Sequence, residues 1–400
     1  MTPKRALLPT LATALLPLLA ACGAEGRAAA AWTGTMDTLP SGEVVVHNTD
    51  QPMWPAGSEW RAEEDLRIGT MEGNGPDLLG NVRWMEVDPA GRIWVLEGQA
   101  QEIRIFGPDG TYLKTVGREG GGPGEFAGAL HIQMGPDGNM WVVDPQNNRV
   151  SLFDTSGTFV ESKLIPGGFT IIPWPGGFDA SGHQYGPIPL PGDELFNLGL
   201  VRYDSAFTPV DTLRPPTDPI ERDRFELRRG EDMYWITSIP YTGGFEFHLS
   251  RAGTMWGLVQ DEYRLVELSP GGDTLRVITR EYTPLPVTES DMEAARERLA
   301  DFIRNGGKVD WSKIPNTKPA AEDFFLDDEG YVWVETVVAH ADQGRIFDVF
   351  DPEGRFLGTV TLPFALSMNP PPIVRQSVLY GVTEDELEVP YVVRARIVKP

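Results

Sequence analysis

The sequence contains a single cysteine, Cys22, among 400 residues. No disulfide can therefore form within the chain, and a zinc site built from several cysteines is excluded. Basic residues are also few, because 34 Lys and Arg stand against 58 Asp and Glu, which gives a formal net charge of −24. Proteins that bind nucleic acids neutralise phosphates with Lys and Arg, so this balance argues against a nucleic-acid partner.

Common catalytic motifs are absent as well. The sequence has neither a G-x-S-x-G nucleophile motif nor an H-E-x-x-H metal motif. The glycine-rich run 120–124 lacks the Lys-Ser/Thr ending of a phosphate-binding loop, so we interpret it as a turn. What is abundant is glycine and proline, 44 and 35 residues without a G-X-Y period, which predicts many tight turns. A hydrophobic fraction of 41% is enough for a sizeable core and excludes wholesale disorder.

The N-terminus has the pattern of an export signal. Lys4 and Arg5 precede the apolar stretch 6–18, which at about 13 residues is too short to span a bilayer but typical of a signal peptide. It ends in Leu19-Ala20-Ala21-Cys22, which resembles the bacterial lipobox. This resemblance implies that Cys22 is acylated and becomes the first residue of the mature protein. The alternative is an ordinary signal peptide with a chance cysteine.

These features divide the chain into three parts. Residues 1–21 are interpreted as the lipoprotein signal peptide, 22–41 as a lipidated flexible tether rich in small residues, and 42–400 as one domain. A lipid on Cys22 would anchor the domain to a membrane without a transmembrane helix. We therefore expect a location in the bacterial cell envelope, and Gly23, in place of the Asp of known sorting rules, favours the outer membrane.

An internal repeat organises the domain. Five turn glycines are each followed, three residues later, by a large aromatic residue. The pairs are Gly91 with Trp94, Gly138 with Trp141, Gly182 with Tyr185, Gly253 with Trp256, and Gly330 with Trp333. The first two spacings between these glycines are 47 and 44 residues. Short strands bounded by tight turns at this period are typical of the four-stranded antiparallel blades of a β-propeller.

A sixth blade can be assembled from both ends of the chain. The segments Ser377–Val382 and Tyr391–Val398 supply strands, and Leu66–Gly69 supplies an outer strand. Pairing the two chain ends would remove free sheet edges. We therefore predict an all-β fold, a six-bladed propeller closed by N- and C-terminal strands. The pairing of Val44–His47 stays open.

Two insertions interrupt the period. Residues 214–244 are rich in proline and charge and predict a long surface loop. Residues 288–304 predict a helix that starts at Thr288 as N-cap, with Met292, Leu299 and Phe302 on its apolar face. We expect this helix to pack on one rim of the ring.

Two segments carry a resemblance to a known family. The unit from Gly138 to Val150 resembles NHL repeats, and Gly117–Phe126 resembles the Gly-rich interblade loop of bacterial six-bladed β-propeller lipoproteins. The resemblance covers about residues 60–400 and implies a fold and a binding role, with no specific ligand. In such repeats the position of Asn147 and Asn148 serves turn geometry, so we do not interpret this pair as metal ligands.

Polar residues recur on the first strand of each blade. Side chains four and six residues before each turn glycine are mostly apolar, and those five and seven before it are mostly polar, so the two sets lie on opposite faces. Because the first strand of a blade lines the central channel, we expect the polar set to face it. The candidate ligand-binding residues at the channel mouth are Glu86, His131, Gln133, Glu246, His248 and Asp323.

Two functions fit this arrangement. The first is a monomeric binding or scaffold module, without a cofactor, for a peptide, glycan or protein partner of the envelope. The second is a metal-dependent hydrolase, lactonase or lyase, in which His131, Glu246, His248 and Asp323 would hold Ca²⁺ or Zn²⁺. A channel wall whose acids and histidines are merely solvated is the third interpretation of the same residues.

Overall fold

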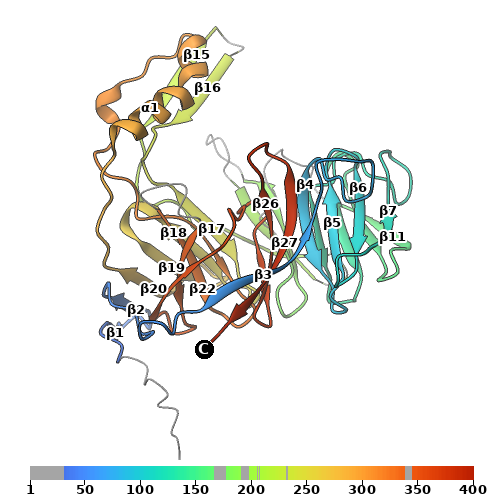
Figure 1. Ribbon diagram of the computed structural model, residues 1–400, viewed down its shortest axis with the longest axis horizontal. Coiled ribbons are helices and arrows are strands. Elements are labelled where there is room, and N and C mark those ends of the chain that lie inside the picture. The colour runs from blue at the N-terminus through green and yellow to red at the C-terminus, as the bar shows by residue number, and fades with distance from the viewer. Residues whose placement is uncertain are drawn as a thin grey trace, which may run out of the picture.

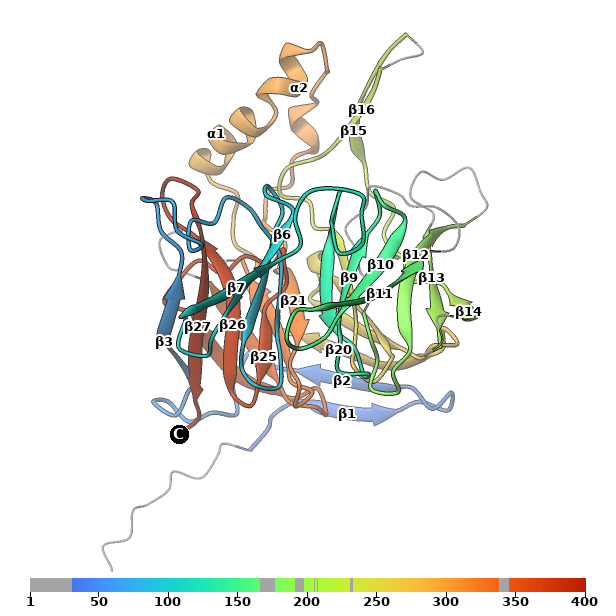
Figure 2. The ribbon, with the colours of Figure 1, turned by 90° about the vertical axis from the view of Figure 1, so that its right-hand side faces the viewer.

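The computed structural model describes residues 31–165, 177–190, 198–204, 206, 208–230, 233–337 and 345–400. The predicted signal peptide and Cys22 lie outside these residues. In the described part, six sheets surround a central axis as the blades of a propeller, and a separate two-stranded sheet stands apart from them (Figures 1 and 2). The predicted all-β, six-bladed propeller is confirmed.

Within each blade, consecutive strands run from the central channel of the ring outward. Blade 1 comprises β4 (Val82–Val87), β5 (Ile93–Glu97), β6 (Glu102–Phe106) and β7 (Tyr112–Val116). Blade 2 comprises β8 (His131–Met134), β9 (Met140–Asp144), β10 (Arg149–Phe153) and β11 (Phe159–Leu164). Blade 3 has, among the described residues, β12 (Gln184–Pro189), β13 (Leu198–Tyr203) and β14 (Pro209–Leu213).

The other three blades complete the ring. Blade 4 comprises β17 (Phe245–Leu249), β18 (Met255–Val259), β19 (Arg264–Leu268) and β20 (Thr274–Arg280), followed outward by β2 (Val44–Asn48) and β1 (Thr35–Thr38). Blade 5 comprises β21 (Ala321–Leu326), β22 (Val332–Thr336), β23 (Ile346–Phe350) and β24 (Phe356–Thr361). Blade 6 comprises β25 (Ile373–Arg375), β26 (Val378–Glu384), β27 (Pro390–Val398) and β3 (Arg61–Ile68).

The two ends of the chain close the ring in blade 6. β3 pairs antiparallel with β27, from Ile68 opposite Val392 to Arg61 opposite Val398. The predicted closure by an N-terminal outer strand is therefore confirmed. It leaves β27 with a hydrogen-bonded neighbour on both sides.

The N-terminal segment also extends blade 4. β2 pairs in parallel with β20, which answers the question that the sequence left open for Val44–His47. β1 pairs antiparallel with β2, so residues 35–38 of the segment that was interpreted as a flexible tether form a strand. The buried side chain of Asn48 joins blades 4 and 5, because its Nδ2 donates to the carbonyls of Thr279 and Gly354 at 3.2 and 3.0 Å.

The aromatic residue after a turn glycine packs between blades, and in four of the five pairs it also donates a hydrogen bond to an aspartate. Trp94 and Trp333 are fully buried against a neighbouring blade. The indole N–H of Trp94 donates to Asp88, and that of Trp333 donates to Asp327, each over 3.1 Å. Each aspartate also accepts backbone N–H groups of its own turn. The aspartate therefore fastens the turn to the core of the blade.

The Gly-rich segment between blades 1 and 2 has the predicted structural role. Gly117 has φ +77°, and a Cβ there would overlap the fully buried ring of Phe126. Both conditions require glycine. Asn148 has φ +51°, and the Asn147 amide donates to the carbonyl of Gly120 at 3.0 Å. The two asparagines shape the turn, as expected.

The two insertions form one unit, which we call the arm (residues 222–242 and 286–318). The segment predicted as a surface loop contains a hairpin, β15 (Arg224–Arg229) and β16 (Met233–Ser238). The predicted helix is found as α1 (Glu289–Arg298) and α2 (Ala300–Arg304), with Thr288 as its N-cap. A short 3₁₀ helix, η2 (Trp311–Lys313), completes the arm, and another, η1 (Gln260–Glu262), follows β18.

The helix packs on the hairpin and not on the rim of the ring, because the two apolar faces cover each other. Phe225 and Trp235 of the hairpin contact Phe302 of α2, with ring centroids 6.5 and 5.6 Å apart. The arm thus has its own hydrophobic core and stands above one end of the ring (Figure 2). Within the described residues, no helix is long and apolar enough to cross a membrane.

Candidate functional site

A cavity of about 580 Å³ lies at the end of the channel where the first turn of each blade is found. We call it the turn-face cavity. All six blades line it. Its residues include Val87–Pro89 of blade 1, Gln133–Pro136 of blade 2, Phe178–Ala180 of blade 3, Arg251 of blade 4, Asp328 of blade 5, and Arg375, Gln376, Val378 and Tyr380 of blade 6. Such a volume is in the usual range of small-ligand sites.

Glu86 and Gln133 lie on the channel wall, where they join neighbouring blades. Glu86 is buried, and its carboxylate accepts from the Arg375 guanidinium of blade 6 at 2.9 Å and from the Met134 N–H of blade 2 at 3.4 Å. Gln133 Oε1 accepts from the Phe178 N–H of blade 3 at 2.8 Å. Both side chains thus satisfy N–H groups at the inner edges of the sheets, which would otherwise lack partners.

His131 lies deeper in the wall and is buried against the ring of Trp84, with centroids 4.3 Å apart. Burial lowers the pKa of His131 to about 3, so the imidazole is neutral at physiological pH. The cationic form is excluded by its surroundings.

We expect this buried histidine to make the protein sensitive to acid. The unfolded state takes up a proton near the ordinary histidine pKa and the folded state does not, so stability is lost as the pH falls below about 6.5. The loss from His131 alone should reach about 2 kcal/mol at about pH 5. Urea unfolding of wild type and His131→Gln at about pH 7.5 and pH 5 measures it, with the exposed His47→Gln as control. Equal pH dependence in wild type and His131→Gln would refute this assignment.

The other three candidate residues meet between blades 4 and 5. His248 Nε2 lies 3.3 Å from Asp323 Oδ1. Glu246 precedes His248 by two residues on β17 and remains in contact with solvent. Burial among protein groups, together with the charge of Asp323, raises the pKa of Glu246 to about 7.

The structure divides the candidate metal ligands between separate places. His131 lies beside Trp84 in blades 1 and 2, whereas Glu246, His248 and Asp323 belong to blades 4 and 5. Among the described residues, no three His, Cys, Asp or Glu side chains are placed to hold one metal ion. We therefore derive no metal-dependent step from these residues.

Arg251 differs from the other charged residues of the turn-face cavity. Asp88 is bound by Arg92 at 2.6 Å, Asp179 by His183 at 3.0 Å, and Arg375 by Glu86, as described above. Arg251 is exposed, and its guanidinium has no hydrogen bond or ion pair with any residue that the structure describes. It is therefore available to an anionic group of a ligand.

Arg251 and Arg375 were not among the residues predicted from the sequence. Arg251 could have been noticed in the sequence. It is the second residue of its turn, and the same position in blades 1 and 2 is occupied by Pro89 and Pro136. The cavity as a whole combines apolar walls, from Phe178, Tyr380 and these prolines, with one available guanidinium. This combination can bind a small amphipathic ligand and orient it.

Comparisons with known proteins agree with the fold. A family model described as 6-bladed beta-propeller (DUF5128) matches residues 74–171. No curated protein matches the chain. A Bacteroides fragilis protein whose name describes it as exported is 11% identical, with 89% of this chain and 100% of that chain covered and a TM-score of 0.50.

Two further solved structures are similar to this chain. A member of the DUF4221 family from Bacteroides vulgatus is 12% identical over 85% of this chain and 98% of that chain, with a TM-score of 0.50. A gluconolactonase from Xanthomonas campestris is 12% identical over 79% of this chain and 86% of that chain, with a TM-score of 0.40. At these identities the likeness concerns the fold alone.

Proposed function

We propose that the protein is a lipid-anchored binding propeller of the bacterial cell envelope, which holds a short peptide in its turn-face cavity. The observation that carries this proposal is the convergence of all six blades on one cavity of about 580 Å³ with an available guanidinium. A guanidinium matches the planar carboxylate at the end of a peptide, and the apolar walls suit its side chains.

The envelope location rests on the N-terminal sequence. A charged start, a short apolar stretch and a lipobox-like ending at Cys22 are the expected features of a lipoprotein precursor. The similar Bacteroides fragilis protein has a name that describes it as exported, which supports the same location for this chain.

The binding site can be tested by filling it. Ala180 lines the cavity from a turn of blade 3, whereas Ala252 lies in the equivalent turn of blade 4 and does not line it. We expect wild type to retain peptides from a synthetic library with free carboxyl ends, detected by affinity-selection mass spectrometry. Ala180→Trp should weaken the binding of the selected peptides at least about tenfold by occupying the cavity, and Ala252→Trp should leave it unchanged.

Two outcomes would oppose this proposal. Retention of no peptide by wild type would exclude the peptide class, and equal binding by wild type and Ala180→Trp would place the site elsewhere. C-terminal amides of the selected peptides test the role of Arg251 separately. They should bind about tenfold more weakly than the free acids, because the amide carries no charge for the guanidinium.

The anchor has its own test. Cys22→Ser removes the thiol that receives the lipid, so we expect the variant to leave the membrane fraction or to accumulate as unprocessed precursor. Fractionation of cells and immunoblotting measure both effects. If Cys22→Ser fractionates and migrates as wild type does, the lipobox interpretation is wrong.

A further inference from the structure

A second cavity lies between the arm and blade 4, at the other end of β17 from the turn-face cavity. Its volume is about 520 Å³. We call it the arm cleft. Arg222, Arg224 and Ser238 line it from the hairpin side, Arg298 from α1, and Glu246 and Gln260 from the ring. No part of the function proposed above uses this cleft.

One arginine of the arm cleft is fully occupied. Arg222 pairs with Asp218 and with Asp261 of η1, and it donates to the carbonyl of Gly244 at 3.1 Å. These bonds fasten the base of the arm to blade 4. Arg222 balances only one of these two carboxylates, so the group of three keeps a net negative charge at the base of the arm.

Two other arginines of the arm cleft have no such partners. Arg224 and Arg298 are exposed, and neither guanidinium makes a hydrogen bond or ion pair with a residue that the structure describes. The nearby carboxylate of Asp223 is taken by Lys313 at 2.9 Å. In a chain with a formal net charge of −24, Arg224 and Arg298 are the two arginines of this cavity that have no ion pair among the described residues.

Glu246 is the remaining carboxyl group of the arm cleft, and it repels an anion only when it is ionised. Glu246 has a pKa raised to about 7, as described above, so its carboxyl is protonated more readily than that of an ordinary glutamate. The protonated carboxyl can donate a hydrogen bond to a ligand oxygen. Ser238 adds a hydroxyl from the hairpin side of the cleft.

We propose that the arm cleft binds a ligand with two or more carboxylate or phosphate groups, held between Arg224 of the hairpin and Arg298 of α1. Planar guanidinium groups suit both kinds of oxyanion, because each presents paired N–H donors. The site joins the arm to the ring, so an occupied cleft would add contacts between them. It is separate from the turn-face cavity and independent of the function proposed for that cavity.

Isothermal titration with citrate and with inorganic pyrophosphate tests the proposal. Citrate represents the carboxylate source and pyrophosphate the phosphate source. We expect wild type to bind at least one of them, Arg224→Gln and Arg298→Gln each to weaken that binding about tenfold, and the double variant to abolish it. The affinity of wild type should also fall as salt is added.

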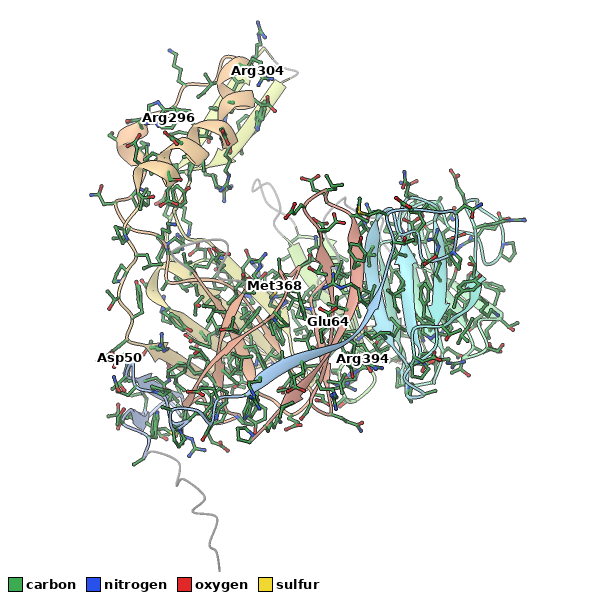
Figure 3. All side chains as sticks on the ribbon, viewed as in Figure 1. Asp50, Glu64, Arg296, Arg304, Met368 and Arg394 are labelled. Carbon is green, nitrogen blue, oxygen red and sulfur yellow. The ribbon has the colours of Figure 1, made fainter. Side chains whose placement is uncertain are left out.

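Arg304→Gln is the matched control. Arg304 is an exposed arginine at the end of the arm that is farthest from the ring (Figure 3), and it pairs with Asp301 at 2.8 Å. The control should bind the anion as wild type does. Arg224 and Arg298 are both exposed, so all variants should have the same thermal unfolding temperature. This result would exclude a folding defect.

Three outcomes would overturn the proposal. These are no binding of either anion by wild type at millimolar concentration, unchanged binding by the double variant, or equal loss in Arg304→Gln. The Ala180→Trp variant separates the two sites. It should retain anion binding in the arm cleft even though it loses peptide binding, so failure of one proposal is distinguishable from failure of the other.

Discussion

Deletion of residues 376–400 will prevent a stable ring from forming, and we expect aggregates in place of a five-bladed remnant. The deletion removes β26 and β27, the two central strands of blade 6. β27 is the strand that pairs with β3 and closes the circle. Without it, β3 loses its partner and the faces of blades 5 and 1 that pack on blade 6 become exposed.

The size of the effect follows from burial. The deleted strands supply core residues that are almost fully buried between blades, namely Leu379, Val382, Val392, Val393, Ala395 and Ile397. Each large apolar side chain contributes about 1.5–3 kcal/mol when buried. Their sum is comparable to the whole stability of a typical domain, which is about 5–15 kcal/mol.

Size-exclusion chromatography and urea unfolding of the deletion variant measure the result. The control is removal of β1, residues 35–38, because every residue of that outermost strand is exposed. We expect the control to remain soluble with a modest loss of stability. A soluble, cooperatively unfolding protein after deletion of 376–400 would show that the ring does not depend on its closure.

Asp348→Ala should cost about 3–5 kcal/mol of stability, the largest effect that we expect from a single substitution. Asp348 is buried between blades 4 and 5, where it accepts from the Tyr263 hydroxyl and lies 3.2 Å from the Arg280 guanidinium. Arg280 also lies over the ring of Phe356, with 4.2 Å from its Cζ to the ring centroid. Removing the carboxylate leaves a partly buried cation and a buried hydroxyl without their partner.

The matched control for this substitution is Asp211→Ala. Asp211 pairs with Arg202 at 2.6 Å, but its side chain is 42% exposed, so its loss should cost no more than about 1 kcal/mol. Urea unfolding of wild type and both variants gives the comparison. Similar small costs for the two substitutions would mean that the buried network contributes little to the contact between blades 4 and 5.

The sequence predicted the ring because the repeat is local. Turn glycines and the aromatic residues after them lie within a few positions of one another, so the pattern survives in each blade without knowledge of the neighbours. The parallel pairing of β2 with β20 could not be predicted in the same way. No turn connects these strands, which lie more than 200 residues apart in the chain, so no local signal specifies their register.

The sequence placed the candidate residues on the first strands of the blades but did not specify their geometry. Alternation along each first strand identified Glu86, Gln133 and His248 as polar positions. That these side chains reach the next blade depends on how blades pack, which a single strand does not encode. The hairpin of the arm left a readable sign, since Phe225 and Leu227 alternate with charged residues. The prolines and charged residues around the hairpin favoured the prediction of a loop.

The central claim is that the turn-face cavity is the ligand site of this propeller. A crystal structure of wild type with the tightest peptide from the library tests it most directly. We expect the peptide to lie in the cavity with its carboxylate on Arg251 and its side chains against Phe178 and Tyr380. A peptide bound on the arm or on an outer strand, with the cavity free of it, would contradict the claim.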